Sequence, residues 1–215
     1  MIRQRIRIRF TKFGDLRFVG HLDFMQCFFR LLRRASIRPA MSQGFHPKPR
    51  VSFPAALPLG VVGEEEILEM EMPELTDAPS LCAKLRDATI PGLFFTSAEV
   101  LPAENIRAKV SAFEYVFAVP EDRREALCRR AQWVMQQETF PFQRVGREKT
   151  VDIKRGLASV CLEADGTLRF RLRADIPDGC GPRDVLGVLE IADVESLGSV
   201  IVRRRVILEA EGFRL

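Results

Sequence analysis

The sequence predicts an α+β fold of two consecutive βαββαβ units, that is, tandem ferredoxin-like repeats with antiparallel sheets. The main observation is that the expected order of strand, helix, strand, strand, helix and strand occurs twice. A polar segment at residues 103–110 separates the two occurrences. We therefore expect one domain at residues 1–102, which is basic and rich in motifs, and a second at residues 111–215. A chain of 215 residues is long enough to bury a core in each.

The first half begins with the clearest strand in the sequence. Residues 2–13 are expected to form a strand with one buried face. The apolar residues Ile2, Ile6, Ile8 and Phe10 fall on one face, and the other face carries Arg3, Arg5, Arg7 and Arg9. Residues 20–35 change to the spacing of an amphipathic helix. Its apolar side is expected at Leu22, Met25, Phe29 and Leu32, flanked by Phe24, Phe28 and Leu31. The remaining elements of this half are short extended pieces at residues 40–41 and 50–57, a strand at 67–72, a helix at 78–89 and a strand at 93–101.

The second half repeats this order. Its expected elements are a strand at residues 113–119, a helix at 122–137, a hairpin of strands at 157–162 and 167–174, a helix at 183–189 and a strand at 199–209. The hairpin turn is predicted at residues 164–166, because Asp-Gly favours a tight turn between strands. Trp133 and the apolar helix faces are interpreted as core.

Composition excludes several classes of protein. No apolar run approaches the roughly 18 residues of a membrane span, and the first ten residues lack the order of a signal peptide. We therefore expect a cytoplasmic protein with no membrane contact. The 5 cysteines form no C-x-x-C pair and there are only 2 histidines. These spacings predict no metal site, and we expect no cofactor.

Positive charge is concentrated at the start of the chain. Residues 1–50 hold 12 Lys and Arg against 2 Asp and Glu, whereas the rest of the chain holds 21 against 27. This asymmetry indicates a local basic surface, which is typical of proteins that bind a polyanion. A solvated charged surface with no partner is the alternative.

The opening strand offers the first candidate RNA-binding residues, Arg3, Arg5, Arg7, Arg9 and Lys12. In a βαββαβ unit the helices cover one face of the sheet, so arginines on the other face could contact phosphates. The alternative is that these arginines pair with Glu69 and Glu71, which the neighbouring strand at residues 67–72 would place opposite them. In the second half Arg169, Arg171 and Arg173 alternate in a similar way.

The loop at residues 42–50 is the second candidate. Its glycine and two prolines predict a stiff, exposed segment. Its hydrogen-bond donors and its aromatic ring suit single-stranded RNA, and they are Gln43, Phe45, His46, Lys48 and Arg50. Turn chemistry alone also explains the glycine and the prolines, so a purely structural loop is the alternative.

His21 is the candidate catalytic residue. At the start of the first helix it could act as a general base on an RNA 2′-hydroxyl, with the helix N-terminus and nearby arginines stabilising a phosphate. The alternative is a local contact between His21 and Asp23 at the helix start. No Ser-His-Asp spacing, carboxylate pair or phosphate-binding glycine loop strengthens the enzyme hypothesis.

Several long strings of residues resemble those of one family, the radical SAM-linked domain of unknown function. In the first half they are Arg7-x-Arg9-Phe10-x-Lys12-x-Gly14-Asp15-Leu16-Arg17-Phe18-x-Gly20-His21-Leu22-Asp23, Leu32-Arg33-Arg34-Ala35, Ser42-Gln43-Gly44-Phe45-His46-Pro47-Lys48-Pro49 and Leu57-Pro58-Leu59-Gly60. In the second half they are Val151-Asp152-Ile153-Lys154 and Gly181-Pro182-Arg183. The resemblance spans most of the chain.

The resemblance implies which proteins the chain is associated with, but not a reaction that it catalyses. Domains of that family are often fused behind, or encoded beside, a radical SAM protein, and their neighbours belong to RNA processing and the ribosome. This chain has no C-x-x-x-C-x-x-C motif, so we expect any radical SAM protein to be a separate partner. The expected fold with an early histidine also resembles CRISPR repeat-cleaving endoribonucleases, but residues 179–181 are too short for their glycine-rich C-terminal loop.

Three functions are compatible with these observations. The leading hypothesis is a non-catalytic RNA-binding or substrate-presenting module, accessory to a radical SAM system and acting on RNA of the rRNA or tRNA class. The second is a metal-independent endoribonuclease that uses His21 or His46. The third is a protein-interaction module that binds no RNA, in which the arginines are internally paired.

Overall fold

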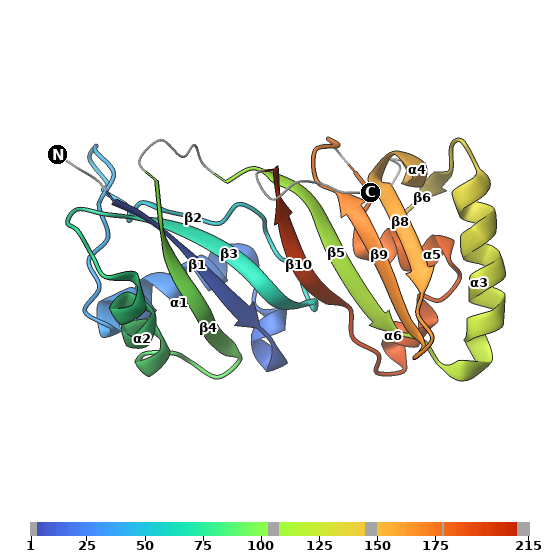
Figure 1. Cartoon of the computed structure of the whole chain (residues 1–215), viewed down its shortest axis with the longest axis horizontal. Coiled ribbons are helices and arrows are strands. Elements are labelled where there is room, and N and C mark those ends of the chain that lie inside the picture. The colour runs from blue at the N-terminus through green and yellow to red at the C-terminus, as the bar shows by residue number, and fades with distance from the viewer. Residues whose placement is uncertain (1–3, 103–107, 145–149, 178, 210–215) are drawn as a thin grey trace. The chain divides into compact units, whose positions relative to one another are not determined.

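The computed structural model of the chain describes residues 4–102, 108–144, 150–177 and 179–209 (Figure 1). The chain divides into two compact units, Met1–Lys109 and Val110–Leu215. Each unit combines helices with an antiparallel sheet, which confirms the predicted α+β class. The expected link at residues 103–110 falls largely outside the described residues. Within the described ranges, no helix is long and apolar enough to cross a membrane.

The first unit contains a four-stranded antiparallel sheet. Its strands are β1 (Gln4–Lys12), β2 (Val51–Ser52), β3 (Val62–Met72) and β4 (Leu93–Leu101), in the spatial order β4-β1-β3 with β2 on the far side of β3. Its helices are the 3-10 helix η1 (Gly14–Phe18), α1 (His21–Arg34) and α2 (Ala78–Asp87). Strand β3 starts five residues earlier than the sequence predicts, and β4 has the predicted bounds.

One face of this sheet carries the core of the first unit. The alternation of β1 places Ile6, Ile8 and Phe10 on that face, where they pack against the apolar sides of α1 and α2. The arginines of β1 therefore lie on the opposite face, as a period of two residues requires. Burying apolar side chains contributes roughly 25 cal/mol per Å² of surface removed from water, so this face fixes the register of the strand.

The buried side of α1 is centred on the flanking residues of the expected apolar side. The side chains packed into the core are Phe24, Phe28, Leu31 and Leu32. Leu22, which was expected on the apolar side, is 75% exposed. The side of the helix that carries Phe28 is buried because Phe28 packs against two other rings, with centroid distances of 5.8 Å to Phe53 and 6.2 Å to Phe95. Aromatic rings bury more surface than Leu22 or Met25 could.

The second unit has the sheet order β10-β5-β9-β8, again antiparallel. Its sheet strands are β5 (Val110–Ala118), β8 (Leu157–Leu162), β9 (Thr167–Arg173) and β10 (Val202–Leu208). Its longer helices are α3 (Glu121–Gln136) and α5 (Pro182–Val188). The sequence did not predict a small hairpin of β6 (Pro141–Gln143) and β7 (Thr150–Asp152), or the single-turn helices α4 (Ile153–Gly156) and α6 (Asp193–Ser196).

Trp133 is not a core residue, contrary to the prediction. Its side chain is 45% exposed and packs edge-on against Phe140 at a centroid distance of 5.5 Å. The guanidinium of Arg130 lies 4.6 Å from the indole centroid. Helix α3 directs only Leu127 and Val134 fully into the core, so the indole covers the outer edge of the helix instead.

Candidate nucleic-acid interface

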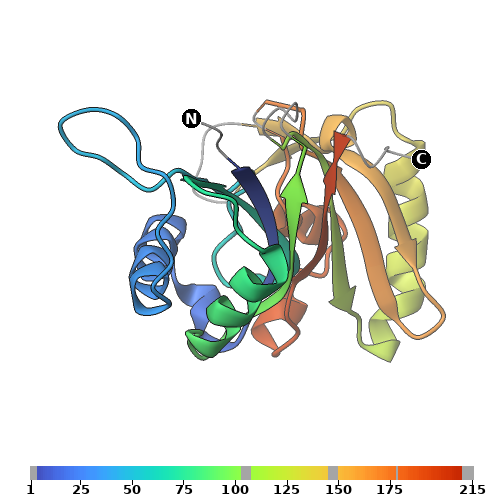
Figure 2. The ribbon, with the colours of Figure 1, turned by 60° about the vertical axis from the view of Figure 1, so that its left-hand side comes forward.

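The loop between α1 and β2 projects away from the sheet and helices of the first unit (light blue in Figure 2). Hydrogen bonds between backbone groups fix its base: the Arg50 N–H donates to the Ala40 carbonyl at 2.7 Å and the Ala40 N–H donates to the Glu71 carbonyl at 2.7 Å. The Ser42 N–H donates to the Lys48 carbonyl at 2.8 Å. The loop therefore begins as a short antiparallel ribbon attached to β3.

The tip of the loop, residues 43–47, is exposed. Phe45 is 102% exposed, so its ring makes no packing contact within the described residues. Gly44 has a φ of +121°, a backbone conformation that favours glycine and that turns the chain at the tip. Burying a phenylalanine side chain contributes about 1.5–3 kcal/mol, and the described part of the fold does not use this contribution at Phe45.

Positive charge without matching negative charge surrounds this loop in the sequence. No Asp or Glu lies between Asp23 and Glu64, whereas the same stretch contains the cations Arg30, Arg33, Arg34, Arg38, Lys48 and Arg50. Arg30, Arg33, Arg38 and Lys48 are exposed, and none of their side chains has an ion pair or hydrogen bond to any other described residue. We call these four residues the unpaired cations of the first unit.

The other two cations of the stretch have structural partners. Arg34 donates from Nη2 to the carbonyls of Ala88, just after α2, and of Thr89, the latter at 3.2 Å. Arg50 donates to Glu71 at 3.2 Å and to the Met41 carbonyl at 3.3 Å. Arg34 thereby joins α1 to α2, and Arg50 holds the base of the loop.

The arginines of β1 face glutamates, which favours the alternative interpretation of this strand. Arg7 donates from Nη2 to Glu69 Oε1 at 2.9 Å, and Arg7 Nη1 lies 3.5 Å from Glu99. The Glu69 side chain is 2% exposed and that of Arg7 is 14% exposed. Arg9 Nη1 lies 3.7 Å from Glu65, which is within ion-pair distance but too long for a hydrogen bond.

The remaining candidate residues of the opening strand are also unsuited to phosphate, where they are described. Arg5 lies opposite Glu71 in the ladder and lines a cavity of about 80 Å³ together with Arg50, Glu69 and Glu71, so the local charge is balanced. Lys12 lies on the core side of β1, two residues after Phe10. It is 3% exposed, donates to the Val19 carbonyl at 2.7 Å and lies 4.9 Å from the Phe24 ring centroid. Arg3 lies outside the described residues.

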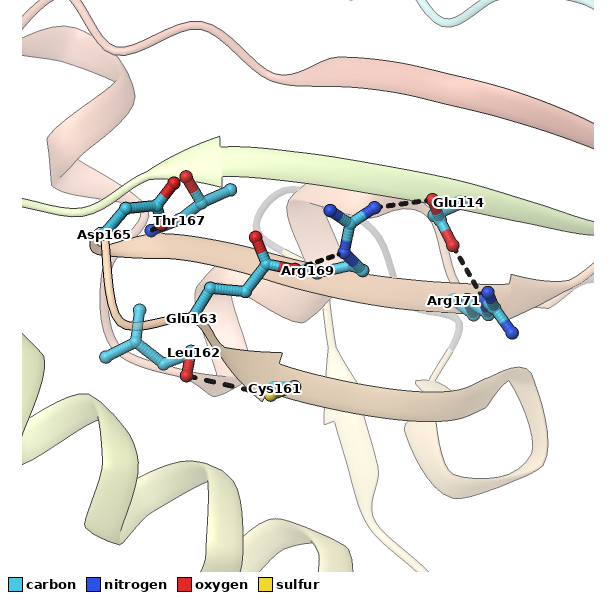
Figure 3. Close-up of polar contacts among 8 residues, drawn as sticks. All are labelled: Glu114, Cys161, Leu162, Glu163, Asp165, Thr167, Arg169 and Arg171. Carbon is cyan, nitrogen blue, oxygen red and sulfur yellow. Dashed lines mark hydrogen bonds and ion pairs between the residues drawn. The ribbon is translucent and has the colours of Figure 1, made fainter.

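The second unit repeats this pairing of arginine with glutamate on its sheet (Figure 3). Glu114 of β5 accepts hydrogen bonds from Arg169 at 2.7 Å and Arg171 at 2.8 Å, and Arg169 also donates to Glu163 at 2.6 Å. Burial would raise the pKa of Glu114, but the hydrogen bonds from Arg171 and Arg169 outweigh it and hold the pKa below its ordinary value. Arg169 and Arg171 therefore form ion pairs with glutamates of their own unit.

His21 lies at the start of α1 beside a very small cavity. The cavity has a volume of about 10 Å³ and is lined by Phe10, Lys12, His21, Phe24, Phe53, Ala55, Leu57 and Glu66. This volume is close to that needed for one water molecule, so the cavity does not admit a ribose. Two of its lining side chains, Lys12 and Glu66, are charged and almost fully buried.

The motif at residues 151–154 in the second half stabilises the local backbone. Asp152 accepts hydrogen bonds from the N–H groups of Phe140 at 2.9 Å and Lys154 at 3.0 Å. The Lys154 ammonium donates to the Met135 carbonyl at 2.9 Å. These contacts tie the end of α3 to the β6–β7 hairpin and α4, which explains this motif without a ligand.

A metal centre has no support in the described parts of the chain. Among residues 4–102, 108–144, 150–177 and 179–209, no group of three or more His, Cys, Asp or Glu side chains could hold an ion.

Sequence reasoning placed the loop residues Gln43, Phe45, His46 and Lys48 together, and the structure presents all four as exposed residues of one projection. It missed Arg30, Arg33 and Arg38 as candidate binding residues. The absence of acidic residues between Asp23 and Glu64 is the signal that could have identified them.

A family model described as an uncharacterized protein conserved in bacteria (DUF2344) matches residues 5–180. The chain belongs to this family. No curated protein matches the sequence. The crystal structure of a protein designated a glycine cleavage system transcriptional repressor is similar over 94% of this chain and 96% of that chain, with 13% identity and a TM-score of 0.24.

Proposed function

We propose that the protein binds single-stranded RNA through the loop at residues 42–48 and the unpaired cations of the first unit, and that it does not itself catalyse a reaction on the RNA. The observation that carries this proposal is the fully exposed ring of Phe45 at the tip of a loop with a hydrogen-bonded base. A bound base would stack on the ring, while phosphates would lie against the cations.

The chemistry of this surface favours RNA over a protein partner. A site for single strands combines aromatic faces, on which bases stack, with cations that follow the phosphates. The loop offers Phe45 beside His46 and Lys48, with no carboxylate between Asp23 and Glu64 to repel phosphate. The arginines of β1, by contrast, fit the protein-interaction alternative, because glutamates neutralise Arg7 and Arg9.

An equilibrium binding assay with a fluorescent single-stranded RNA tests the proposal. Phe45→Ala should weaken binding by about 1–3 kcal/mol without changing the salt dependence, because stacking releases no counterions. Lys48→Ala should instead make the slope of log affinity against log salt shallower by about 0.7, the value for one phosphate of a single strand.

Matched controls come from the second unit. Leu197 is an exposed apolar residue and Arg155 an exposed cation with no partner among the described residues, so Leu197→Ala and Arg155→Ala should leave affinity and slope unchanged. If the unmodified protein binds no RNA at low salt, or if the two loop variants behave like these controls, the proposal is wrong.

We infer further that the two units are ferredoxin-like repeats. Support comes from the strand order: each unit places its first strand between its third and fourth sheet strands, as β4-β1-β3-β2 and β10-β5-β9-β8. The βαββαβ order of the main elements in each unit supports the same inference.

We also propose that the protein acts in the cytoplasm and presents RNA of the rRNA or tRNA class to a separate radical SAM protein. The five free cysteines suit a reducing compartment. The partner is supported only by the sequence strings around His21 and residues 42–49, which resemble those of the radical SAM-linked domain. Affinity purification of the tagged protein from cells tests this partnership, and recovery of RNA without any radical SAM protein would contradict it.

An endoribonuclease is the second candidate function. It is favoured by one observation, the position of the half-buried His21 beside the charged side chains of Lys12 and Glu66. Because the cavity between them does not admit a ribose, RNA would have to reach His21 from outside the cavity. A nuclease of this kind would leave a 2′,3′-cyclic phosphate, and His21→Ala would abolish the product. Under the binding proposal, RNA incubated with the protein stays intact.

A further inference from the structure

A second feature of the first unit is a cavity of about 480 Å³ between the turn that follows α1 and the start of α2. Its size falls within the range of small-molecule sites, roughly 300–1,000 Å³. The residues that the argument uses are Ile37, Arg38, Met72, Glu74, Leu81 and Lys84.

The floor of the cavity is apolar. Ile37, Met72 and Leu81 line it, and all three belong to the buried core of the unit. A flat, weakly polar group could therefore lie on this floor and remove its own surface from water. Such burial contributes roughly 25 cal/mol per Å² of apolar surface.

The rim of the cavity is fixed by hydrogen bonds. Gln4 of β1 accepts from the Thr76 N–H at 2.6 Å and donates to the Thr76 carbonyl at 3.1 Å. Asp77 accepts from the Ser80 N–H at 2.9 Å and caps α2. These contacts hold the segment that carries Glu74 in place before any ligand arrives.

The opposite rim begins at the residue that terminates α1. Ser36 has a φ of +55°, a conformation uncommon for residues other than glycine, and it ends α1. The Ile37 N–H then donates to the Leu32 carbonyl at 2.9 Å, which directs the chain toward Arg38. With the hydrogen bond from the Ser36 N–H to the Arg33 carbonyl at 3.1 Å, this is the usual left-handed ending of a helix, and it fixes where Arg38 leaves α1.

Three charged side chains at the cavity lack partners. Arg38, Lys84 and Glu74 line it, and none of their side chains has a hydrogen bond or ion pair to another residue in the described ranges. The cations suit a phosphate, since guanidinium and ammonium groups donate several hydrogen bonds to one. The carboxylate of Glu74 suits a donor such as a base amino group or a ribose hydroxyl.

We propose that this cavity binds one nucleotide, with its phosphate at Arg38 and Lys84 and its base on the apolar floor. The inference rests on the proposed RNA binding, because Arg38 is also one of the unpaired cations. It extends that function by adding a site where a single nucleotide leaves the strand and is held apart from its neighbours. Bases of single strands can be splayed out and recognised in this way.

The same chemistry could come from a free nucleotide or from one nucleotide of an RNA strand. Two measurements separate these sources. The first is calorimetric titration of the full chain with AMP, GMP, CMP and UMP in turn. The second is binding of a short single-stranded RNA to the same protein preparation.

Variants of the cavity cations provide the test. Arg38→Ala and Lys84→Ala should each weaken the affinity for the bound mononucleotide about tenfold or more. Both residues are exposed, so the variants should keep the circular dichroism spectrum and melting temperature of the unmodified protein. Arg155→Ala, an exposed cation of the second unit, should leave mononucleotide affinity unchanged.

The outcomes distinguish this inference from the proposed function. If no mononucleotide binds at millimolar concentration, or if the two cavity variants bind as the unmodified protein does, the cavity is not a nucleotide site. If Phe45→Ala still weakens RNA binding in that case, the proposed function survives without the cavity. If mononucleotides bind through Arg38 and Lys84 but RNA does not bind, the cavity serves a free nucleotide and RNA binding is the proposal that fails.

Discussion

At the scale of single residues, the neighbours of each arginine decide what it can do. Arg7 lies beside a buried glutamate at 2.9 Å, so its charge stabilises the sheet. Lys48 and Arg38 have no such neighbour among the described residues, and both are exposed, so their hydrogen-bond donors face solvent. The sequence placed Glu69 and Glu71 opposite the β1 arginines as one alternative, but alternation alone could not show whether the side chains meet.

The Arg7–Glu69 pair gives the first residue-scale prediction. Glu69→Ala should lower the free energy of unfolding by about 3 kcal/mol, because it leaves the largely buried Arg7 charge without this partner. Glu99→Ala is the matched control, since Glu99 faces the same arginine at 3.5 Å but is 57% exposed, and it should cost less than about 1 kcal/mol. Urea denaturation of both variants measures the difference. Equal losses would show that burial of Glu69 is unimportant.

Glu114 gives a prediction about pH. Its folded-state pKa lies below the ordinary value of 4.5, so the ionised carboxylate stabilises the fold above that pH and the contribution is lost as the pH falls through the folded pKa. Glu114→Gln should therefore destabilise the protein most at about pH 6 and least at about pH 3. Urea denaturation at the two pH values tests this, and a penalty that grows on acidification would contradict it.

At the scale of elements, the structure departs from the sequence predictions where contacts between distant residues decide the packing. The bounds of β4 and β8 match the predictions, because alternation in a strand depends on nearby residues alone. The centre of the buried side of α1 does not match, since Phe53 and Phe95, which are distant in sequence, select the Phe28 side. The β6–β7 hairpin was missed because its strands have three residues each, too few to show a period.

The turn before β4 gives an element-scale prediction. Gly92 has a φ of +82°, and a Cβ there would lie 2.5 Å from the Phe13 carbonyl oxygen and 2.8 Å from Leu16 Cβ. Gly92→Ala should therefore lower stability by more than about 2 kcal/mol. Gly14→Ala is the control, since Gly14 also has a positive φ but open space around it, and only the backbone cost of about 1–2 kcal/mol should appear. Similar melting temperatures for the two variants would contradict this account.

The loop at residues 42–50 is the element that sequence reasoning described best. Its glycine and prolines predicted an exposed turn, and its aromatic ring and donors predicted the character of its surface. The partner of Arg50 could not be predicted in the same way, because it depends on β3 lying beside β2, which places Glu71 within 3.2 Å. Lys48 is consequently the better test of phosphate contact in this loop.

At the scale of the whole molecule, positive charge is unevenly distributed along the chain. Both units use antiparallel sheets on which arginine and glutamate pair, as Arg7 with Glu69 and Arg169 with Glu114 show. The basic excess of the first unit lies in residues 1–50, which hold 12 cationic side chains against 2 acidic ones, whereas residues 51–109 hold 4 against 10. Fields of this kind attract polyanions. We therefore expect RNA contacts to concentrate in the first unit.

Photo-crosslinking tests the central claim most directly. A single-stranded RNA that contains 4-thiouridine is bound to the full chain at low salt and irradiated, and the crosslinked peptides are identified by mass spectrometry. We expect crosslinks within residues 42–50, centred on Phe45 and His46, and their loss in Phe45→Ala. Crosslinks confined to the second unit or to β1, or no crosslink at all, would contradict the claim that this loop is the RNA-binding surface.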